Sequence, residues 1–563
     1  MLANRHSPRR PALFWTFVAA LALAGCASAP VPPTELSIFS INDFHGHIQS
    51  KSPVPLMTRM TDPKTGELKP QAAGGAAYLA TVLSGLRAKH PNSIFVAAGD
   101  LMGASPQLSS LLLDEPTLSA MSEMGLDATA LGNHDMDAGL TELQRKTRGE
   151  CPIKGCAWPE FKGASFPFLA ANMLDAETGK PVLPTHKMVE VAGMKIALVG
   201  AVTRDTPKVI VAKSIRGLRF IDEADAMNAL VPQLRAEGAQ LLVAMMHEGS
   251  LTDGPANDPT YACSGLRGRG ADIANRLDPA YGIIISGHTH QAYTCKIKGR
   301  LLVQAGSFGG WITESRLKVS ANGEVLDAQA VNYPVLQGVN APNPAFAALV
   351  ARAGELTNLI RNRPITTLTS GATRRIAAPY GDSSMGNLIT DAQLTYAKKR
   401  GVADVAMINS GGIRADLVIE PGKAVTMGDL FAIQPFGNEL VVMTLTGAQL
   451  HESVMRQLPK TLEPRRFAQV SNNFRFQFNQ AADGKSTLTS LTLDGKPLEP
   501  TKDYRVVVNN FMAEGGDDFS VFRQGRDKVT LGVDVDALVE YLAENPKAVD
   551  QIAPGRIVRT EDK

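Results

Sequence analysis

Five short apolar segments of this chain each end at residues that can bind a metal ion, and this pattern constrains the fold more than any other feature. The segments, each with the residues that follow it, are Leu36 to Ile41 before Asn42-Asp43-Phe44-His45, Ile94 to Ala98 before Gly99-Asp100, Ala128 to Leu131 before Gly132-Asn133-His134-Asp135, Leu241 to Met246 before His247-Glu248, and Ile283 to Ile285 before Ser286-Gly287-His288-Thr289-His290. Short apolar runs bounded by glycine and polar residues are typical of buried strands. Because α/β folds place their chemistry in loops beyond strand ends, the pattern predicts one cleft in which distant parts of the sequence meet.

Together the five loops offer two aspartates, one asparagine and four histidines as candidate metal ligands. Two divalent cations about 3.5 to 4 Å apart need a bridging carboxylate, with imidazole nitrogens and amide or carboxylate oxygens at the remaining positions. Such a pair binds a phosphoryl oxygen and lowers the pKa of a bound water, so no serine or cysteine nucleophile is needed. These ligand types in this order along the chain therefore predict a two-metal site, although each such residue alone is common in the turns that follow strands.

In the order Asn-Asp-Phe-His-Gly-His, Ala-Gly-Asp, Leu-Gly-Asn-His-Asp, His247 and Gly-His-Thr-His, the chain resembles the calcineurin-like metallophosphoesterases, and among them the periplasmic and ectoenzyme 5'-nucleotidase branch. The resemblance implies one metal held by Asp43, His45, Asp100 and His290, and a second held by Asp100, Asn133, His247 and His288, with Asp100 as the bridge. It also implies that His134 is the catalytic histidine and Asp137 its carboxylate partner. An imidazolium held by a carboxylate can stabilise charge on the phosphoryl group or the leaving oxygen. We leave His47 outside the metal set and expect it at the surface or behind the ligands.

The first 25 residues are typical of a bacterial secretion signal, with a basic start, an apolar core from Ala12 to Ala24 and the tetrad Leu23-Ala24-Gly25-Cys26. This tetrad predicts a lipidated Cys26. The alternative is an ordinary signal cleaved beyond it, at Ala27-Ser28-Ala29. No later stretch approaches the roughly 20 apolar residues that a membrane span needs. We expect an exported protein anchored by lipid in the cell envelope, in the periplasm or at the outer membrane of a Gram-negative bacterium.

Four cysteines remain once Cys26 is assigned to lipid, and an even number in an exported chain favours disulfides. We expect Cys151 to pair with Cys156 and Cys263 with Cys295. Zinc binding is the competing interpretation, but the spacings lack the paired Cys-x-x-Cys pattern.

With 563 residues, the chain is long enough for two domains that each bury a core. Its formal charge is +2, and −1 without the three signal arginines, so no footprint for a nucleic-acid polymer is present. No sequence feature indicates an obligate protein partner. A boundary is predicted near residue 340, where Gly338 to Pro344 precede apolar residues at helical spacing.

We therefore expect five segments: a lipoprotein signal (1–25), a tether (26–34), a dimetal catalytic domain (35–338), a linker helix (339–364) and a substrate-binding domain (365–558). The resemblance implies a mixed α/β and α+β architecture. By the same resemblance, we expect the first domain of the chain to have four α/β/β/α layers and the last domain to be an α/β nucleotide-binding domain.

The last domain carries four glycine-bearing blocks, namely Met385-Gly386-Asn387-Leu388-Ile389-Thr390-Asp391-Ala392, Asn409-Ser410-Gly411-Gly412-Ile413-Arg414, Pro435-Phe436-Gly437-Asn438, and Asn510 to Phe519. Glycines beside polar residues allow close approach to a ligand. The blocks are similar to the C-terminal domain of the same family. The resemblance implies that Phe436 and Phe511 sandwich the base, Asn409 helps to read it, Asp517 binds ribose and Arg414 grips phosphate.

One departure concerns phosphate binding. Family members commonly carry further arginines around the Met-Gly-Asn-Leu block, where this chain has Asn387, although Arg374 and Arg375 lie upstream. The substrate preference could thus have moved from monophosphates toward nucleotide sugars, dinucleotides or cyclic nucleotides.

The expected activity is two-metal hydrolysis of nucleoside 5'-monophosphates, with manganese, zinc, cobalt or iron as the ions. The alternatives are a 2',3'-cyclic-nucleotide phosphodiesterase, a sulfur-compound hydrolase, or a nucleotide-binding surface lipoprotein without activity.

Overall fold

The computed structural model describes residues 32–49, 59–61, 68–70, 72–153, 155–368, 371–375, 381–401, 403–419, 422–461, 467–552 and 554–560. The predicted signal and the lipidation residue Cys26 lie outside the described residues. Among the helices in these ranges, none is both long enough and apolar enough to cross a bilayer.

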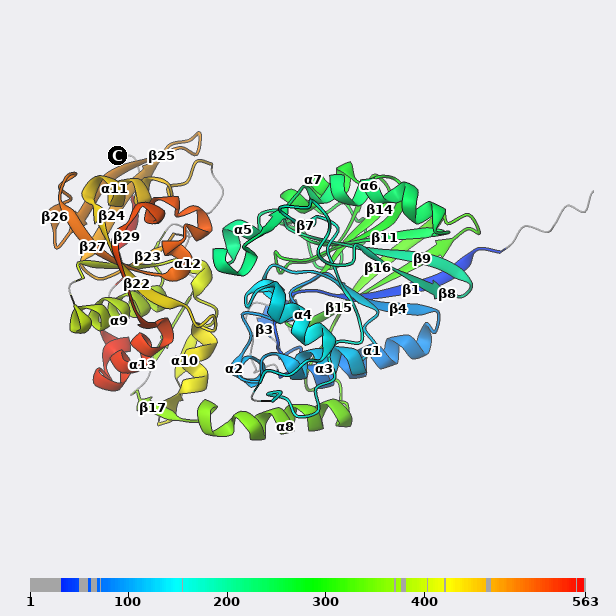
Figure 1. Ribbon diagram of the computed structural model, residues 1–563, viewed down its shortest axis with the longest axis horizontal. Coiled ribbons are helices and arrows are strands. Elements are labelled where there is room, and N and C mark those ends of the chain that lie inside the picture. Colours follow the sequence, from blue (N-terminus) through cyan, green and yellow to red (C-terminus); the bar gives the residue numbers. More distant parts are fainter. Residues whose placement is uncertain are drawn as a thin grey trace, which may run out of the picture.

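Two six-stranded sheets build the first domain (Figure 1). The first sheet has the order β16 (Val325–Pro334), β15 (Trp311–Val319), β1 (Thr34–Ile41), β4 (Ser93–Ala97), β5 (Ala128–Ala130), β6 (Phe168–Leu169). The second has the order β13 (Ala292–Ile297), β14 (Arg300–Ala305), β12 (Tyr281–Ser286), β11 (Leu241–His247), β9 (Met194–Val202), β8 (His186–Val191). Two further short antiparallel pairs are β2 (Arg59–Thr61) with β3 (Leu68–Pro70) and β7 (Met173–Asp175) with β10 (Leu218–Phe220).

Along each strand, alternate side chains pack against the opposite sheet and against the outer helices. The two sheets and the helices on either side of them therefore form four layers. In β4, Ile94 and Val96 face the opposite sheet, where they pack with Leu198 and Val243. Phe95, between them, packs with the helices on the outer face. This period of two is what a strand buried on both faces requires. The predicted α/β/β/α architecture is confirmed.

Helices cover both outer faces of the paired sheets. They are α1 (Ala76–Lys89), α2 (Gln107–Ser110), α3 (Glu115–Glu123) and α4 (Leu140–Arg148) with η1 (His134–Met136) on the first sheet's side, and α5 (Thr206–Val209), α6 (Glu223–Ala236) and α7 (Arg269–Arg276) with η2 (Ala212–Ile215) along the rest of the domain. Asp222 caps α6 by accepting a hydrogen bond from the backbone N–H of Asp225, which satisfies one of the free donors at the helix start.

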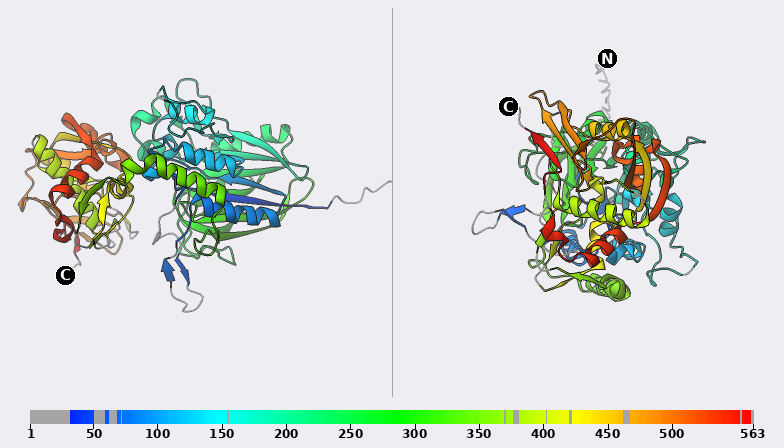
Figure 2. Two further views of the ribbon diagram at one scale, coloured as in Figure 1. Left: turned by 90° about the horizontal axis from the view of Figure 1, so that it is seen from below. Right: turned by 90° about the vertical axis from the view of Figure 1, so that its left-hand side faces the viewer.

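One helix, α8 (Pro344–Arg361), carries the chain from the first domain to the second (Figure 2). The side chain of Asn343 caps the helix by accepting a hydrogen bond from the backbone N–H of Ala345. A proline occupies the first turn, where its fixed backbone angle favours helix initiation. The helix falls within the residues that the sequence marks as a linker.

The second domain holds a five-stranded sheet, a four-stranded sheet and their helices (yellow to red in Figure 1). The sheets have the orders β23 (Gln469–Val470), β19 (Val405–Ile408), β27 (Asp503–Asn509), β22 (Glu439–Thr446), β28 (Arg526–Val533), and β26 (Lys496–Pro497), β25 (Ser486–Leu493), β24 (Phe474–Gln480), β29 (Ile557–Thr560). Two small pairs join β17 (Pro364–Thr367) to β21 (Ala424–Thr426) and β18 (Gly371–Thr373) to β20 (Leu417–Ile419). The helices are α9 (Ser384–Arg400), α10 (Met427–Ile433), α11 (Gly447–Met455), α12 (Asn510–Ala513) and α13 (Asp534–Glu544), with η3 (Ser410–Gly412), η4 (Gly516–Asp518), η5 (Ser520–Gln524) and η6 (Ala548–Gln551).

Candidate metal centre and adjoining cavity

The candidate metal ligands all follow the carboxyl ends of parallel strands. Asp43 and His45 follow β1, Asp100 follows β4 and Asn133 follows β5, and these three strands run parallel. From the second sheet, His247 ends β11, and His288 and His290 follow β12, which is parallel to β11. The two sheets therefore present their loops to one place, and all seven residues lie together there.

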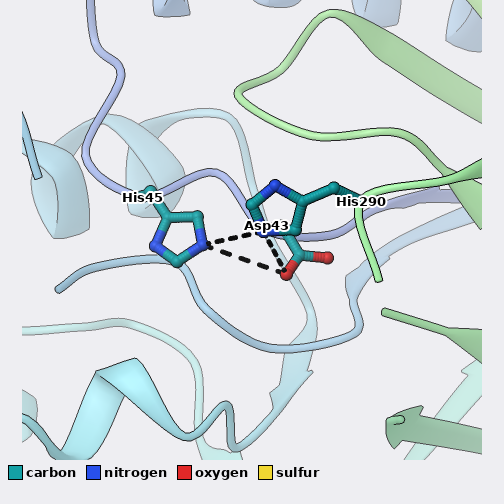
Figure 3. A group of neighbouring side chains, drawn as sticks. All are labelled: Asp43, His45 and His290. Atoms are coloured by element: carbon teal, nitrogen blue, oxygen red, sulfur yellow. Dashed lines mark hydrogen bonds and ion pairs between the residues drawn. The ribbon is translucent and has the colours of Figure 1, made fainter. Parts of the chain in front are cut away.

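The first group consists of Asp43, His45 and His290 (Figure 3). The Nε2 atom of His290 lies 3.2 Å from Oδ1 of Asp43, and the Nε2 atoms of His45 and His290 are 3.3 Å apart. The Nδ1 atom of His45 lies 2.8 Å from the carbonyl oxygen of Gly103. Because Nδ1 donates to that carbonyl, the lone pair of Nε2 faces His290, and a cation between the two rings would satisfy both nitrogens.

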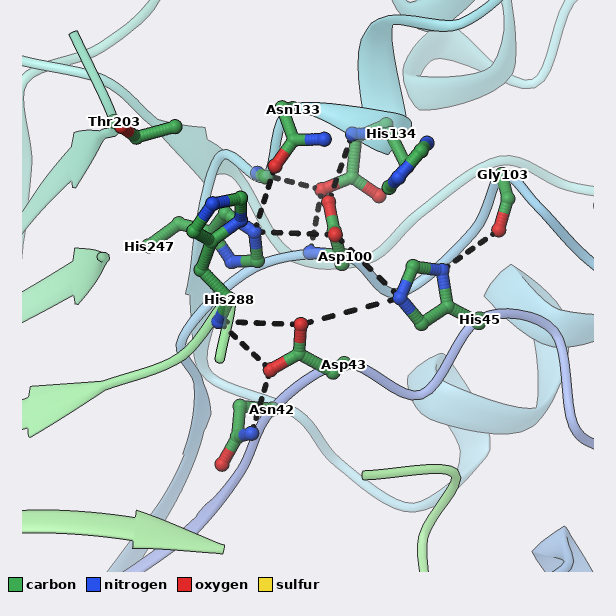
Figure 4. Close-up of polar contacts among 12 residues, drawn as sticks. Asn42, Asp43, His45, Asp100, Gly103, Asn133, His134, Thr203, His247 and His288 are labelled. Atoms are coloured by element: carbon green, nitrogen blue, oxygen red, sulfur yellow. Dashed lines mark hydrogen bonds and ion pairs between the residues drawn. The ribbon is translucent and has the colours of Figure 1, made fainter. Parts of the chain in front are cut away.

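The second group is centred on Asp100 (Figure 4). The Nε2 atom of His247 lies 3.1 Å from Oδ2 of Asp100 and 3.1 Å from Oδ1 of Asn133, while its Nδ1 lies 2.8 Å from the carbonyl oxygen of Ala98. The ring of His288 packs edge-on against that of His247, with centroids 5.2 Å apart. The same Oδ2 of Asp100 is 3.5 Å from Nε2 of His45. Asp100 thus touches both groups, which is the position of a bridging carboxylate.

Burial and neighbouring charges set the protonation of the carboxyl and imidazole groups that could bind cations. Asp43 and Asp100 are at most 1% exposed. Burial alone would raise the pKa of each carboxyl, but neighbouring histidines lower it, to about 2 for Asp43. Burial lowers the pKa of His45 well below its usual value and also lowers that of His288. Burial opposes protonation of His247, but the carboxylates of Asp100 and Asp43 outweigh it and raise its pKa to about 10. A cation bound there would have to displace that proton, and the cluster would then combine anionic carboxylates with neutral imidazoles, which is the donor set that divalent transition ions bind.

The backbone at this centre is held in an uncommon conformation. Asp43, His45, Asp100, His288 and His290 all have φ between 46° and 70°, in the left-handed region. Non-glycine residues rarely adopt it, and such strain concentrates at functional sites. Close packing accompanies it, because a Cβ added to Gly132 would lie 2.0 Å from Oδ1 of Asp100.

Asp135 holds these loops from behind, a role that the sequence did not reveal. Its carboxylate accepts hydrogen bonds from the backbone N–H groups of Asp100, Met102 and Gly132, at 3.1, 3.1 and 2.8 Å. It is 4% exposed. The only sequence signal was its place directly after His134 in the Gly-Asn-His-Asp motif.

His134 and Asp137 form a pair at the mouth of the cluster. The Nδ1 atom of His134 lies 3.0 Å from Oδ2 of Asp137, and the backbone N–H of His134 donates to Oδ1 of Asp100 at 2.8 Å. Burial opposes protonation of His134, but the carboxylates of Asp137 and Asp100 outweigh it and raise the pKa of the ring. A protonated imidazole beside the metal cluster can donate to an anionic oxygen.

A cavity of about 230 Å³ joins this cluster to the second domain. Asp100, His134 and His288 line one part of it, and Arg414 and Phe436 line another. The ring of Phe436 stacks on that of His134, with centroids 5.5 Å apart and planes inclined by 23°. The guanidinium carbon of Arg414 lies 5.6 Å from the centroid of Phe436. Arg414 also lines the same cavity as Asp100, His288 and His290, so its guanidinium lies on the side of the second domain that faces the metal loops.

The other predicted substrate residues line the same cavity. Phe511 does so with only 9% of its surface exposed; it lies in α12 of the second domain, whereas Phe436 lies in the turn that follows α10. Asn409 donates from Nδ2 to Oδ2 of Asp517 at 2.7 Å and accepts from Nδ2 of Asn509 at 3.0 Å. Its amide therefore positions Asp517 and keeps one further N–H and one further lone pair. Asn409 lines the cavity, and its role in reading a base stays a prediction.

Some lining residues were not singled out from the sequence. Asn438 lies in the cavity wall beside Phe436, and Val209, Ile210 and Val211 of the first domain line it as well. Asn438 was visible within the Pro-Phe-Gly-Asn block, whereas the three apolar residues carried no motif.

The remaining side chains that the sequence singled out have structural partners. The half-buried His47 stacks on Phe308, whose ring meets those of His45 and His290 edge-on. Arg374 forms an ion pair with Asp416 at 3.0 Å. Nη1 of Arg375 donates to the carbonyl oxygen of Ile413, which precedes Arg414, at 3.4 Å.

Both expected disulfides are present. One joins Cys151 to Cys156 and the other joins Cys263 to Cys295. The second fastens β13 to the loop that follows His247, so it ties together the flanks of the His288 loop.

Two family models match the chain. That of the calcineurin-like phosphoesterases matches residues 36–292, and that of the 5'-nucleotidase C-terminal domain matches residues 364–524. The metal loops lie in the first match. Arg414, Phe436 and Phe511 lie in the second.

Individual relatives extend along nearly the whole chain. Endonuclease YhcR of Bacillus subtilis and cell wall protein Lmo0130 of Listeria monocytogenes are each 30% identical across 95% of this chain, which spans 42% and 69% of their respective lengths. A 5'-nucleotidase of Vibrio cholerae is 27% identical across 95% of this chain and 96% of its own. The crystal structure of a 5'-nucleotidase precursor from Thermus thermophilus superposes with a TM-score of 0.75 at 23% identity, covering 94% of this chain and all of that one.

Proposed function

Because this chain belongs to the calcineurin-like phosphoesterases that carry a 5'-nucleotidase C-terminal domain, we propose that it hydrolyses nucleoside 5'-monophosphates to nucleoside and phosphate. The observation that carries the proposal is one cavity lined by the candidate ligands Asp100 and His288 of the first domain and by Arg414 and Phe436 of the second. A phosphate at the metal loops and a base at Phe436 are joined in one molecule only in a nucleotide.

Two divalent ions fit the donor set. One would be held by Asp43, His45, Asp100 and His290, and the other by Asp100, Asn133, His247 and His288. The ions would supply a nucleophilic water near neutral pH and offset the negative charge of the phosphoryl group. The protein orients the ligands through the carbonyl oxygens of Gly103 and Ala98, which fix the tautomers of His45 and His247.

His134 is the proton donor in the proposed reaction. The oxygen of a water forms a bond to phosphorus and releases a proton to solvent, while the bond from phosphorus to the ribose oxygen breaks. The protonated imidazole transfers its proton to that departing oxygen and is then reprotonated from solvent. Asp137 keeps that imidazole protonated and oriented through its 3.0 Å hydrogen bond.

The second domain recognises the nucleoside. Phe436 offers a ring face for stacking, and Phe511 borders the same space, so any base can be accepted. Asp517, fixed by Asn409, is placed to accept hydrogen bonds from ribose hydroxyls. Arg414 supplies a guanidinium near the phosphate.

The setting of the enzyme is also proposed. The tetrad Leu23-Ala24-Gly25-Cys26, at the end of the signal-like segment, supports export and attachment to the cell envelope by lipid on Cys26. There the enzyme would release nucleosides from nucleotides that do not cross the inner membrane.

The test is phosphate release by signal-free protein with Mn²⁺ or Zn²⁺, across AMP, UDP-glucose, NAD, 2',3'-cyclic AMP and p-nitrophenyl phosphate. Metal-dependent turnover with AMP preferred is the expected result. Preference for another nucleotide would move the substrate class, and turnover of the aryl phosphate alone would refute nucleotide recognition.

A further inference from the structure

A strap from the metal-binding domain, residues 206–215, reaches across to the second domain. It comprises α5, the residues Ile210 and Val211, and η2. In Figure 1, α5 projects from the first domain toward α12 of the second. It lies against η4, the turn that carries Asp517.

Consecutive residues of the strap pack into the cores of different domains. Ile210 is 4% exposed and belongs to the core under the first sheet of the metal-binding domain. Val211 packs against the core of the second domain, which includes Phe511 and Phe519. A polar contact accompanies this, because the backbone N–H of Ala212 donates to Oε2 of Glu514 at 2.9 Å.

Both roots of the strap are fastened beside the metal centre. At its start, Thr206 donates from Oγ1 to the carbonyl oxygen of Thr203, and Oγ1 of Thr203 donates to Glu248, the residue after His247. Near its end, Oγ of Ser214 donates to the backbone carbonyl oxygen of Asp137 at 2.7 Å. The strap is therefore held rigidly with respect to the catalytic residues.

Between these anchors, Val209, Ile210 and Val211 line the cavity that also contains Phe436 and Phe511. We propose that the strap is a third wall of the nucleoside site, supplied by the metal-binding domain, and that it determines the preference for nucleotides over simple phosphate esters. The inference rests on the proposed nucleotide hydrolysis.

A small ester needs only the metal loops and His134, whereas a nucleotide also fills the space beside the strap. Burial of an apolar wall against the nucleoside adds binding that a small ester cannot use. The contact of Ala212 with Glu514 keeps the wall in register with the loop of Asp517.

The chain offers a matched pair of variants for the test. Glu514→Ala removes the acceptor for the N–H of Ala212, whereas Glu514→Gln removes the charge and keeps an oxygen acceptor. Val211→Ser removes the packing directly. Lys213→Ala changes an exposed residue of the same strap and serves as the control.

The measurement is the ratio of kcat/KM for AMP to kcat/KM for p-nitrophenyl phosphate, with Mn²⁺-loaded full-length mature protein. We expect this ratio to fall at least tenfold in Val211→Ser and Glu514→Ala, and to change less than threefold in Glu514→Gln and Lys213→Ala. Adenosine affinity by calorimetry should fall in parallel, since it needs no turnover.

Three outcomes separate the ideas. If the ratio of kcat/KM for AMP to that for p-nitrophenyl phosphate is unchanged in both Val211→Ser and Glu514→Ala, the strap is not a third wall of the nucleoside site. The proposed nucleotide hydrolysis would still stand. A wild-type enzyme that hydrolyses p-nitrophenyl phosphate but no nucleotide would overturn the proposed function itself. If Val211→Ser fails to fold by circular dichroism, the Glu514 pair decides alone.

Discussion

The carboxylate of Asp100 accepts a hydrogen bond from the backbone N–H of His134, with 2.8 Å between Oδ1 and N, while its other oxygen faces His247 at 3.1 Å. One side chain thus links the candidate metal centre to the proposed proton donor. Any displacement of Asp100 changes the position of both.

Replacing Asp100 by Asn should abolish turnover and leave the fold intact. The amide can still accept the N–H of His134, but it lacks the charge that two cations share. Loss of several kcal/mol of metal-derived stabilisation corresponds to a fall in kcat of roughly a thousandfold or more. Phosphate release and metal content per chain are the measurements, with circular dichroism as the control. Activity near that of the wild type would rule out a bridging role.

Asp137→Asn should lower kcat for nucleotides by roughly a hundredfold with little change in KM, because the ring of His134 loses the carboxylate that keeps it protonated. The double variant with His134→Ala should be no slower than His134→Ala alone, since Asp137 acts through the ring. Additive losses in that cycle would mean that Asp137 has an independent role.

Phe436→Ala should raise KM for AMP by roughly 5- to 150-fold, because stacking of a base on an aromatic ring contributes about 1 to 3 kcal/mol. Phe436→Tyr keeps the ring face and should stay near the wild type. The comparison is made by steady-state kinetics on AMP, CMP and GMP. A loss confined to kcat would show that the ring supports His134, on which it stacks, and does not hold the base.

Asp534, at the start of α13, should make the fold less stable as the pH rises. The carboxyl is 1% exposed, and burial raises its pKa to about 8. The native state therefore holds a proton that the unfolded state has lost between about pH 4 and pH 8. The free energy of unfolding should decrease across this window, by an amount on the order of a few kcal/mol, and level off above it.

Urea denaturation between pH 5 and pH 8.5 measures this effect. Asp534→Asn should flatten the dependence and be more stable than the wild type at pH 8, whereas Asp536→Asn, an exposed neighbour, should retain the slope. A wild-type slope that survives in Asp534→Asn would place its origin elsewhere.

The cluster of candidate metal ligands could be predicted because its residues carry their own sequence signal. Asp43, Asp100 and His247 each follow a buried apolar run, and such runs end at one edge of a sheet whatever their order in the chain. Asp135 was missed because its role is to bind three backbone N–H groups, which depends on loop paths and not on any residue pattern.

The lining of the adjoining cavity was less predictable than the candidate metal centre. Its aromatic residues were found through their glycine-rich blocks, but Val211 is an ordinary apolar residue whose contacts cross between domains. The double engagement of Asn409 with Asn509 and Asp517 also depends on pairings about a hundred residues apart. Sequence periodicity reports local structure, so contacts of this kind leave no mark in it.

The passage of the chain between its two domains through α8 has an evolutionary consequence. The candidate metal ligands precede α8 in the sequence, and apart from the strap the proposed nucleoside residues follow it, so a single recombination within the helix would exchange most of the proposed recognition site and keep the metal loops whole. Such an exchange would succeed only where the incoming half also packs on Val211 and accepts the backbone N–H of Ala212 as Glu514 does.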